Sequence, residues 1–293
     1  MADRVKKPCI YCGHEADGAK TEYHIIPYSA GNIAEARYPL EELTLPTGLV
    51  CDKCNQYFGS KVEPHLTAHP VVKLWRVLKD VRGRAKTLEY TSEGLKLSSR
   101  KHKILVVEQG QKEKFPIDRS GVIKIRNPPL DKVNHTGVSR ALHKIAFEYE
   151  VRIILNEMVK NEVDVARVRI KDISSTIIET TRKIILGSDY DHIRSYVRKP
   201  KRGEYRPYGM ARDGGTWANV NTIQFKSSND PAIVGPTFNC YIITLAGVRF
   251  IVTTAHDPIL LSYALQQIEK EGYKNYLGVD EIFWNATGFR SIL

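Results

Sequence analysis

Four of the five cysteines in the 293-residue chain stand in two identical C-x-x-C pairs, a spacing that is typical of a metal site. The pairs are Cys9 with Cys12 and Cys51 with Cys54. Four thiolates can surround one Zn²⁺ ion in a tetrahedron, and such a closed site leaves no position open for a substrate. We therefore predict a structural zinc ion that holds the segment between the pairs against the residues after Cys54.

That intervening segment contains TEYHIIPYSAGN, residues 21–32, in which His24 stands at the start of a short apolar run. A neutral imidazole, with an ordinary pKa of about 6.5, is suited to take a proton from water near neutral pH. Two interpretations are open, since His24 is either a surface histidine at the start of a strand or a general base. The residues on either side of the segment decide between them.

The combined pattern of C-x-x-C, then HIIPYSAGN, then LVCDKCNQYFGSKVE resembles the HNH endonucleases of the zinc-bearing ββα-metal type. The resemblance covers residues 9 to about 65. In that family a histidine opens the first strand of a hairpin, and a helix near the second cysteine pair carries an asparagine or histidine four residues before a glycine. His24 matches the first position, and Asn55 with Gly59 matches the second. The resemblance implies that His24 is the general base and that Asn55 is a ligand of a catalytic metal ion.

Such enzymes hydrolyse phosphodiester bonds with one divalent cation, usually Mg²⁺ or Mn²⁺, which neutralises charge on the phosphorane and the leaving oxygen. The cation requires hard oxygen ligands. In the family the residue before the histidine commonly supplies one, but here that residue is Tyr23. Alternate residues of a strand share a face, so Glu22 lies on the same face as His24, and we predict that Glu22 is the replacement ligand. The family's middle asparagine also has no counterpart in LPTGLV, residues 45–50.

A second candidate site is the basic, tyrosine-rich tract RSYVRKPKRGEYRPYGMAR, residues 194–212. Basic side chains can neutralise phosphates, while tyrosines stack on unpaired bases or pack against sugars. The alternative, a solvated surface loop, stays open. The residues predicted to contact nucleic acid are Arg198, Lys199, Lys201, Arg202, Tyr205 and Arg206.

The helices and strands expected from the sequence indicate an α+β fold with two unequal parts. Residues 1–66 form a small zinc-stabilised ββα-metal module, residues 67–83 a connecting helix, and residues 84–293 a larger α+β domain with a mostly antiparallel sheet. The apolar spacing in HPVVKLWRVLKDV places the connecting helix over 69–81.

Within the larger part, the patterns predict antiparallel strands, two helices and two less regular segments. They are a meander over 86–126, a long helix capped by Thr136, an ambiguous run at 176–186, a partly looped segment at 188–209, a hairpin about Ala246 and Gly247, and a helix over 258–272.

The net charge of +11 favours a polyanionic partner, nucleic acid first. No apolar run approaches the roughly 18 to 20 residues of a membrane helix, and no hydrophobic signal segment follows MADRVKKPC. We therefore expect a cytoplasmic protein without a membrane partner.

Together the residues predict a metal-dependent HNH-type endonuclease that cleaves DNA. We expect the DNA to be double-stranded. Bacterial restriction or antiphage defence is a setting that the resemblance alone implies. The larger part would select the target, sense a signal or associate into a homo-oligomer. The main alternative is a zinc-knuckle DNA-binding protein of the same fold that does not cleave, which Tyr23 and the missing asparagine favour. A third is an RNA-binding or RNA-cleaving protein, which the tyrosine-rich tract would suit.

Overall fold

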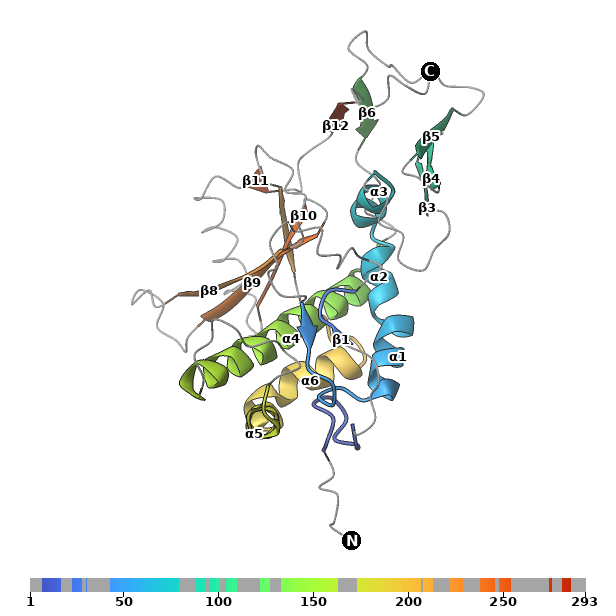
Figure 1. Cartoon of the computed structure of the whole chain (residues 1–293). Helices are drawn as coiled ribbons and strands as arrows, with labels where there is room; N and C mark the ends of the chain where they lie inside the picture. The colour runs from blue at the N-terminus through green and yellow to red at the C-terminus, as the bar shows by residue number, and fades with distance from the viewer. Residues whose placement is uncertain are drawn as a thin grey trace.

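The computed structural model of the chain describes the N-terminal module, the long central helices and most of the strands (Figure 1). The described residues are 7–16, 23–27, 30, 43–78, 88–92, 95–100, 104–109, 122–126, 133–162, 173–206, 208–212, 222–228, 238–245, 248–253, 274–275 and 281–285. Glu22, Val81 and the helix predicted over 258–272 lie outside these residues.

The N-terminal module contains a very short hairpin followed by a helix. Strand β1 (Tyr23–His24) pairs antiparallel with β2 (Thr44–Leu45), and His24 lies opposite Thr44. Helix α1 (Asp52–Lys61) follows, and its N-cap is Cys51, whose Sγ accepts a hydrogen bond from the Cys54 N–H at 3.5 Å. The short helices α2 (Glu63–Thr67) and α3 (Pro70–Leu78) continue from it. This is the ββα order that the sequence predicts.

Among the described residues after α3, the chain forms three antiparallel sheets and three α-helices. The largest sheet has the order β11-β7-β10-β9-β8, the second has the order β3-β4-β5, and β12 pairs with β6. The strands are β3 (Leu88–Ser92), β4 (Leu95–Arg100), β5 (Ile104–Gln109), β6 (Val122–Arg126), β7 (Gly209–Arg212), β8 (Thr222–Ser228), β9 (Phe238–Leu245), β10 (Val248–Thr253), β11 (Lys274–Asn275) and β12 (Glu281–Asn285). Every described strand pair is antiparallel, which confirms the α+β class and the mostly antiparallel sheet.

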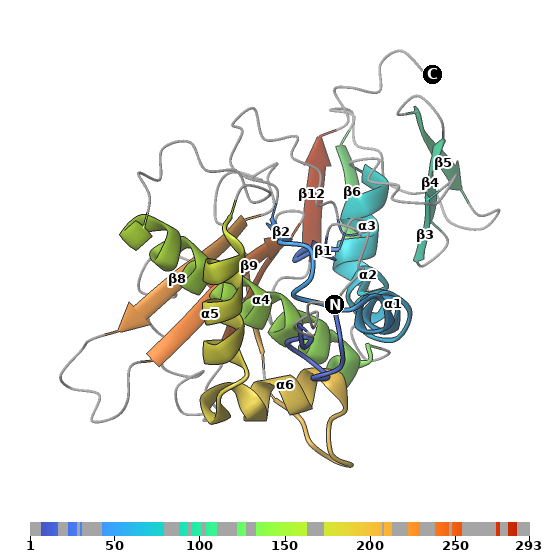
Figure 2. The same ribbon diagram turned by 60° about the horizontal axis from the view of Figure 1, so that its bottom comes forward.

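Helix α4 (His135–Glu162) is the centre of the molecule (Figures 1 and 2). It packs against β9 and β10 on one side and against α2, α5 (Ser175–Ile185) and α6 (Asp191–Arg198) on others. A helix that is buried on several sides carries apolar residues on each of them, and in α4 these stand beside a few buried polar and charged residues. Its fully buried apolar residues are Val138, Ala141, Leu142, Ile145, Ala146, Phe147, Val151 and Leu155. They join buried residues of the N-terminal module, among them Ile10, Tyr11 and Phe58, in one hydrophobic core.

The structure corrects several local predictions. Helix α4 begins one residue before Thr136, and its cap is Asn134, whose Oδ1 accepts the Gly137 N–H at 2.9 Å. The ambiguous run at 176–186 is helical in α5, and the segment at 188–209 contains helix α6 before its loop. Strands β3, β4 and β5 form the predicted meander, but β6 pairs with the distant β12. The predicted hairpin of β9 and β10 is present, with Leu245 opposite Val248.

None of the helices in the described part of the chain has the length and apolarity needed to cross a membrane.

Helices α2 and α4 meet where Gly137 lies directly against His65. A methyl group built on Gly137 would stand 2.8 Å from the His65 Cβ, too close for any rotation of the imidazole to relieve. The His65 Nδ1 lies 3.5 Å from the Asn134 amide nitrogen, within this same contact. Glycine is required here because only a bare backbone allows the two helices to approach so closely.

We predict that Gly137→Ala destabilises the protein by about 1–3 kcal/mol, because the added methyl group overpacks the contact between α2 and α4. Urea denaturation measures this loss. Gly59→Ala is the matched control, since Gly59 is exposed in α1 and its nearest neighbour would be Glu63 Oε2 at 4.0 Å. The control should be neutral or stabilising by up to about 1 kcal/mol. Equal effects of the two substitutions would contradict the close contact.

Candidate active site and zinc centre

The four cysteines of the two C-x-x-C pairs converge, as predicted. Their Sγ atoms all lie within 4.8 Å of one another, and those of Cys12 and Cys51 are 3.7 Å apart. A tetrahedral site with Zn–S bonds of about 2.3 Å places its sulfur atoms about 3.8 Å apart, so the cluster fits a structural zinc ion. The N–H groups of Tyr11 and Cys51 both donate to Cys9 Sγ at 3.4 Å, which stabilises a thiolate there. Among the described residues, no other group of histidines, cysteines and acids could hold a metal ion.

The four neighbouring thiols affect one another's ionisation. The hydrogen bond with Cys54 lowers the pKa of Cys9 to about 4 and raises the pKa of Cys54 well above its ordinary value. The sulfur atoms are so close that one thiolate opposes the formation of the next. A divalent cation removes this opposition, because metal binding favours deprotonation of all its thiol ligands.

His24 and Asn55 occupy the local structures that the sequence predicts for them. His24 lies half-buried in β1, and the next residue, Ile25, donates its N–H to the Leu43 carbonyl at 2.7 Å. Asn55 lies half-buried in the first turn of α1, where its N–H bonds to the Cys51 carbonyl at 3.0 Å. Cys51, one of the four cysteines of this centre, is therefore also the N-cap of the helix that carries Asn55. The catalytic roles of both residues, and of Glu22 outside the described residues, stay predictions.

Tyr23, the neighbour of His24, turns into the core. Its side chain is buried, and the Lys144 ammonium group lies 4.9 Å from its ring centroid and 5.9 Å from that of Phe58. Successive residues of a strand point to opposite faces, so His24 is directed away from this buried cluster. The position that carries a metal ligand in the family is here part of the hydrophobic core.

A buried charge network beside Tyr23 is a feature that sequence reasoning missed. Lys144 Nζ lies 2.9 Å from Glu148 Oε2 and 3.0 Å from Glu63 Oε1, and the Tyr11 hydroxyl donates to the other oxygen of Glu148. The side chains of Lys144 and Glu148 are 1% and 0% exposed. The available signal was a Lys–Glu pair at four-residue spacing in an otherwise apolar stretch of helix.

Burial raises the pKa of Glu148 to about 7, although Lys144 and Tyr11 act in the opposite direction. Burial alone would lower the pKa of Lys144, but the charges of Glu148 and Glu63 outweigh it and raise that pKa, so the ammonium group stays protonated. The network therefore holds a permanent cation next to a carboxyl group that titrates near neutral pH.

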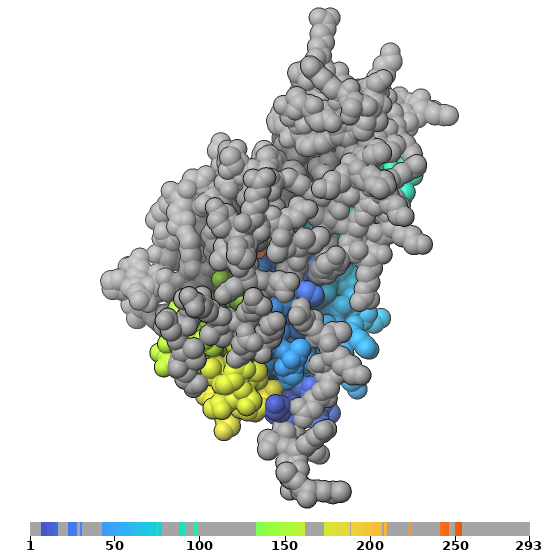
Figure 3. Space-filling view, viewed as in Figure 1, coloured from blue at the N-terminus to red at the C-terminus, as the bar shows by residue number. Residues whose placement is uncertain are grey.

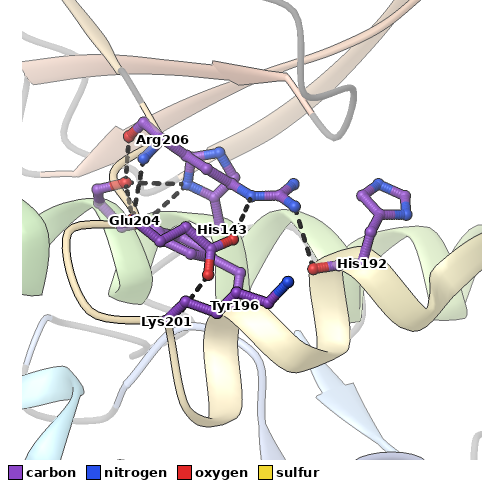
Figure 4. Close-up of polar contacts among 7 residues, drawn as sticks. His143, His192, Tyr196, Lys201, Glu204 and Arg206 are labelled. Atoms are coloured by element: carbon purple, nitrogen blue, oxygen red, sulfur yellow. Dashed lines mark hydrogen bonds and ion pairs between the residues drawn. The ribbon is translucent and has the colours of Figure 1, made fainter.

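The basic tract divides into an exposed part and a buried part. The exposed residues are Arg198, Lys199, Lys201, Arg202 and Tyr205. Arg206 is only 2% exposed, and its guanidinium group lies 5.0 Å from the Tyr196 ring and donates to the His192 carbonyl at 3.0 Å (Figure 4). Because the Arg206 side chain is buried, we do not include it in the proposed nucleic-acid contact.

A hydrogen bond joins the exposed part of the tract to the N-terminal module. The Tyr57 hydroxyl on α1 donates to the Arg198 carbonyl at 2.9 Å, and Arg140 on α4 donates to the same carbonyl at 3.0 Å. The loop itself is closed by Glu204, whose carboxylate accepts the Lys201 N–H at 2.8 Å. Figure 3 shows the yellow surface in the region of α5 and α6, the helix that leads into the exposed part of the tract, next to the blue surface of the N-terminal module. The tract thus lies beside the helix that carries Asn55.

The hairpin, the helix and the four-cysteine centre, which fits a structural zinc ion, together define a ββα module. Residues 9–71 match the family model described as HNH endonuclease, which confirms the resemblance predicted from the sequence. Comparisons with curated proteins and with solved structures gave no match. The match supports a nucleic-acid-related function for this module.

We predict that Glu148→Gln changes how stability depends on pH. The pKa of Glu148 is about 7 in the folded protein and about 4.5 in its ordinary state, so the folded state binds more protons between these values. Its contribution to the free energy of unfolding therefore falls as the pH rises from about 4.5 to 7. Urea denaturation at pH 5.5 and pH 7.5 gives the free energy of unfolding of both proteins. The value for the parent minus the value for Glu148→Gln should be lower at pH 7.5 than at pH 5.5.

Glu157→Gln is the control for this measurement, because Glu157 lies on the same helix with 59% of its side chain exposed. Its stability difference from the parent should be the same at both pH values. The buried titration would be refuted if Glu148→Gln behaved like Glu157→Gln.

Proposed function

We propose that the protein is a metal-dependent endonuclease that hydrolyses phosphodiester bonds of DNA. The main support is the ββα module, in which His24 opens a hairpin and Asn55 lies in the first turn of a helix capped by a cysteine of the metal centre. The match of residues 9–71 to the HNH endonuclease family supports the same conclusion. Double-stranded DNA as substrate and a setting in restriction or antiphage defence extend this proposal from the family resemblance.

In the proposed reaction, His24 accepts a proton from the water that attacks phosphorus, and its position at the hairpin fixes where that water is held. Asn55 and Glu22 offer amide and carboxylate oxygens, the ligand types that Mg²⁺ and Mn²⁺ prefer. A bound divalent cation would supply charge neutralisation at the scissile phosphate. The four-cysteine centre takes no part in the chemistry, because a closed tetrahedral site has no open position.

The exposed tract would hold the nucleic acid beside the module. Arg198, Lys199, Lys201 and Arg202 offer four positive charges at the surface, and Tyr205, 44% exposed, offers a ring for stacking. The bonds from Tyr57 and Arg140 to the Arg198 carbonyl use only its backbone, so they leave the side chain of Arg198 available. The tract and α1 can therefore follow one stretch of phosphate backbone.

A second candidate function is DNA binding without cleavage, and Tyr23 is the observation that favours it. Burial and the nearby charge of Glu148 raise the pKa of Tyr23 well above its ordinary value, so its phenol stays protonated. A protonated, buried phenol cannot replace the metal-binding carboxylate that the family usually places there. The metal would then depend on Asn55 and Glu22 alone.

We predict that His24→Ala abolishes cleavage of supercoiled plasmid in the presence of Mn²⁺, because the general base is lost. General-base catalysis contributes about 10²–10⁴-fold, so the rate should fall by at least this order. Asn55→Ala and Glu22→Gln should instead raise the Mn²⁺ concentration needed for half-maximal cleavage. Agarose gels of plasmid cleavage at graded Mn²⁺ concentrations give both quantities.

The control is His192→Ala, which removes an exposed histidine on α6 while leaving the backbone carbonyl that binds Arg206. It should cleave like the parent. Zinc content and DNA affinity should persist in all these variants. If His24→Ala cuts plasmid as fast as the parent, the proposed mechanism is wrong.

We predict that replacing Arg198, Lys199, Lys201 and Arg202 together with Ala weakens DNA binding and flattens its dependence on salt. Each lost phosphate contact lowers the slope of log K against log salt by about 0.9, because fewer counterions are released. Fluorescence anisotropy with a labelled duplex, measured across a salt series, gives the slope.

The matched control replaces three exposed lysines outside the tract, Lys73, Lys160 and Lys183, with Ala. This control lowers the net charge by a similar amount but should leave the slope nearly unchanged. Equal slopes for the tract variant and the parent would show that the tract is a solvated loop.

A further inference from the structure

Helix α4 presents a buried row of charged side chains to the N-terminal module. Lys144, Glu148 and Arg152 follow one another at four-residue spacing, so they lie on one face of the helix. Their exposed fractions are 1%, 0% and 4%. Long charged side chains are rarely buried unless they are paired, so each of the three must have a partner.

The partners of this row lie on both sides of His24 and opposite it. Lys144 Nζ lies 3.5 Å from the carbonyl oxygen of Ile25, the residue after His24, and over the ring of Tyr23, the residue before it. Arg152 Nη1 donates to the carbonyl of Thr44 at 2.9 Å, and Thr44 is the residue that pairs with His24 across the hairpin. Both strands are therefore held from the same helix.

Glu148 connects this row to the zinc centre. Its carboxylate receives Lys144 on one oxygen and the Tyr11 hydroxyl on the other, and Tyr11 lies between the zinc ligands Cys9 and Cys12. Through Lys144 on one side and Tyr11 on the other, Glu148 therefore links the hairpin to the loop of the first cysteine pair.

The hairpin needs such support because it is very short. Strands β1 and β2 have two residues each, and even a longer isolated two-stranded hairpin is only marginally stable in water. Helix α4, with 28 residues at the centre of the core, is by contrast a rigid platform. Donors fixed on that platform can define where the hairpin carbonyls, and so the His24 backbone, must lie.

We infer that Lys144, Glu148 and Arg152 are positioning residues that set the His24 hairpin for catalysis from the central helix of the larger part. This inference rests on the proposed nuclease function for its catalytic consequence, but the hold on the hairpin is a property that can be measured separately. None of the three residues touches the substrate in this proposal, since all are buried.

The test compares three variants with the parent. Two are single substitutions, Arg152→Met and Arg152→Lys, and the third is a double variant that carries both Lys144→Met and Glu148→Gln. The double variant removes both charges of the Lys144–Glu148 pair, and Gln retains an acceptor for Tyr11. Glu63 loses its ion pair with Lys144, but its side chain is 17% exposed and reaches solvent.

Lys160→Met is the matched control, because Lys160 lies on the same helix with 54% of its side chain exposed. Each protein is checked for zinc content and for its unfolding transition before comparison.

The first measurement is amide hydrogen exchange by mass spectrometry over residues 23–27 and 43–46. Arg152→Met and the double variant should exchange faster there than the parent, Arg152→Lys should recover part of the protection through its remaining donor, and Lys160→Met should match the parent. Unchanged protection in Arg152→Met and in the double variant would overturn the inference.

The second measurement is the rate of plasmid cleavage. A misplacement of about 1 Å can cost on the order of 100-fold in rate, so kcat of Arg152→Met should fall by about 10- to 100-fold with KM nearly unchanged. A looser hairpin with an unchanged kcat would overturn the catalytic part of the inference. If the parent itself does not cleave, the proposed function fails, and hydrogen exchange alone still decides whether α4 holds the hairpin.

Discussion

The ion pair between Lys144 and Glu148 is the interaction on which the arrangement of this molecule depends. It is completely buried, it receives Glu63 and Tyr11 from the N-terminal module, and it stands at the centre of the core helix. Removing one member of a buried pair typically costs about 3–5 kcal/mol when the other charge is left without a partner. Here that holds for the loss of Lys144, whereas the loss of Glu148 still leaves Lys144 paired with Glu63. The pair joins α4 to Glu63 on α2 and to Tyr11 beside the four-cysteine centre. The same ammonium group also lies against the end of the short hairpin, 3.5 Å from the Ile25 carbonyl oxygen.

The positive charge of the chain serves two purposes that sequence counts cannot separate. Some of the basic side chains are buried and donate hydrogen bonds to backbone carbonyls. Arg152 donates to the Thr44 carbonyl, Arg182 to the Gly48 carbonyl at 2.8 Å, and Arg206 to the His192 carbonyl. These guanidinium groups connect α4, α5 and the loop after α6 to backbone oxygens. In the described part of the chain, the exposed basic side chains at 198–202, beside α1, stay available to a polyanion.

Sequence reasoning identified what depends on residue type and local spacing. The zinc centre follows from two C-x-x-C pairs, and the hairpin and helix follow from the pattern around His24 and Asn55. Features decided by distant contacts were less accessible. The β-branched run of α5 looked equally like a strand, and burial of Ile177, Thr181 and Ile185 on one helical face favours the helix. The pairing of β6 with β12, and the burial of Lys144 and Glu148, depend on partners far away in the chain. Similarly, nothing local distinguishes the buried Arg206 from its exposed neighbours.

The most direct test of the central claim is incubation of the zinc-loaded protein with supercoiled plasmid at neutral pH, with Mn²⁺ or Mg²⁺ and without either. The account predicts nicked or linear plasmid only where the divalent cation is present, and DNA binding in every case. Plasmid that stays supercoiled at all Mn²⁺ and Mg²⁺ concentrations, bound by protein with its zinc retained, would contradict the account. That result would establish instead a zinc-stabilised DNA-binding protein that does not cleave.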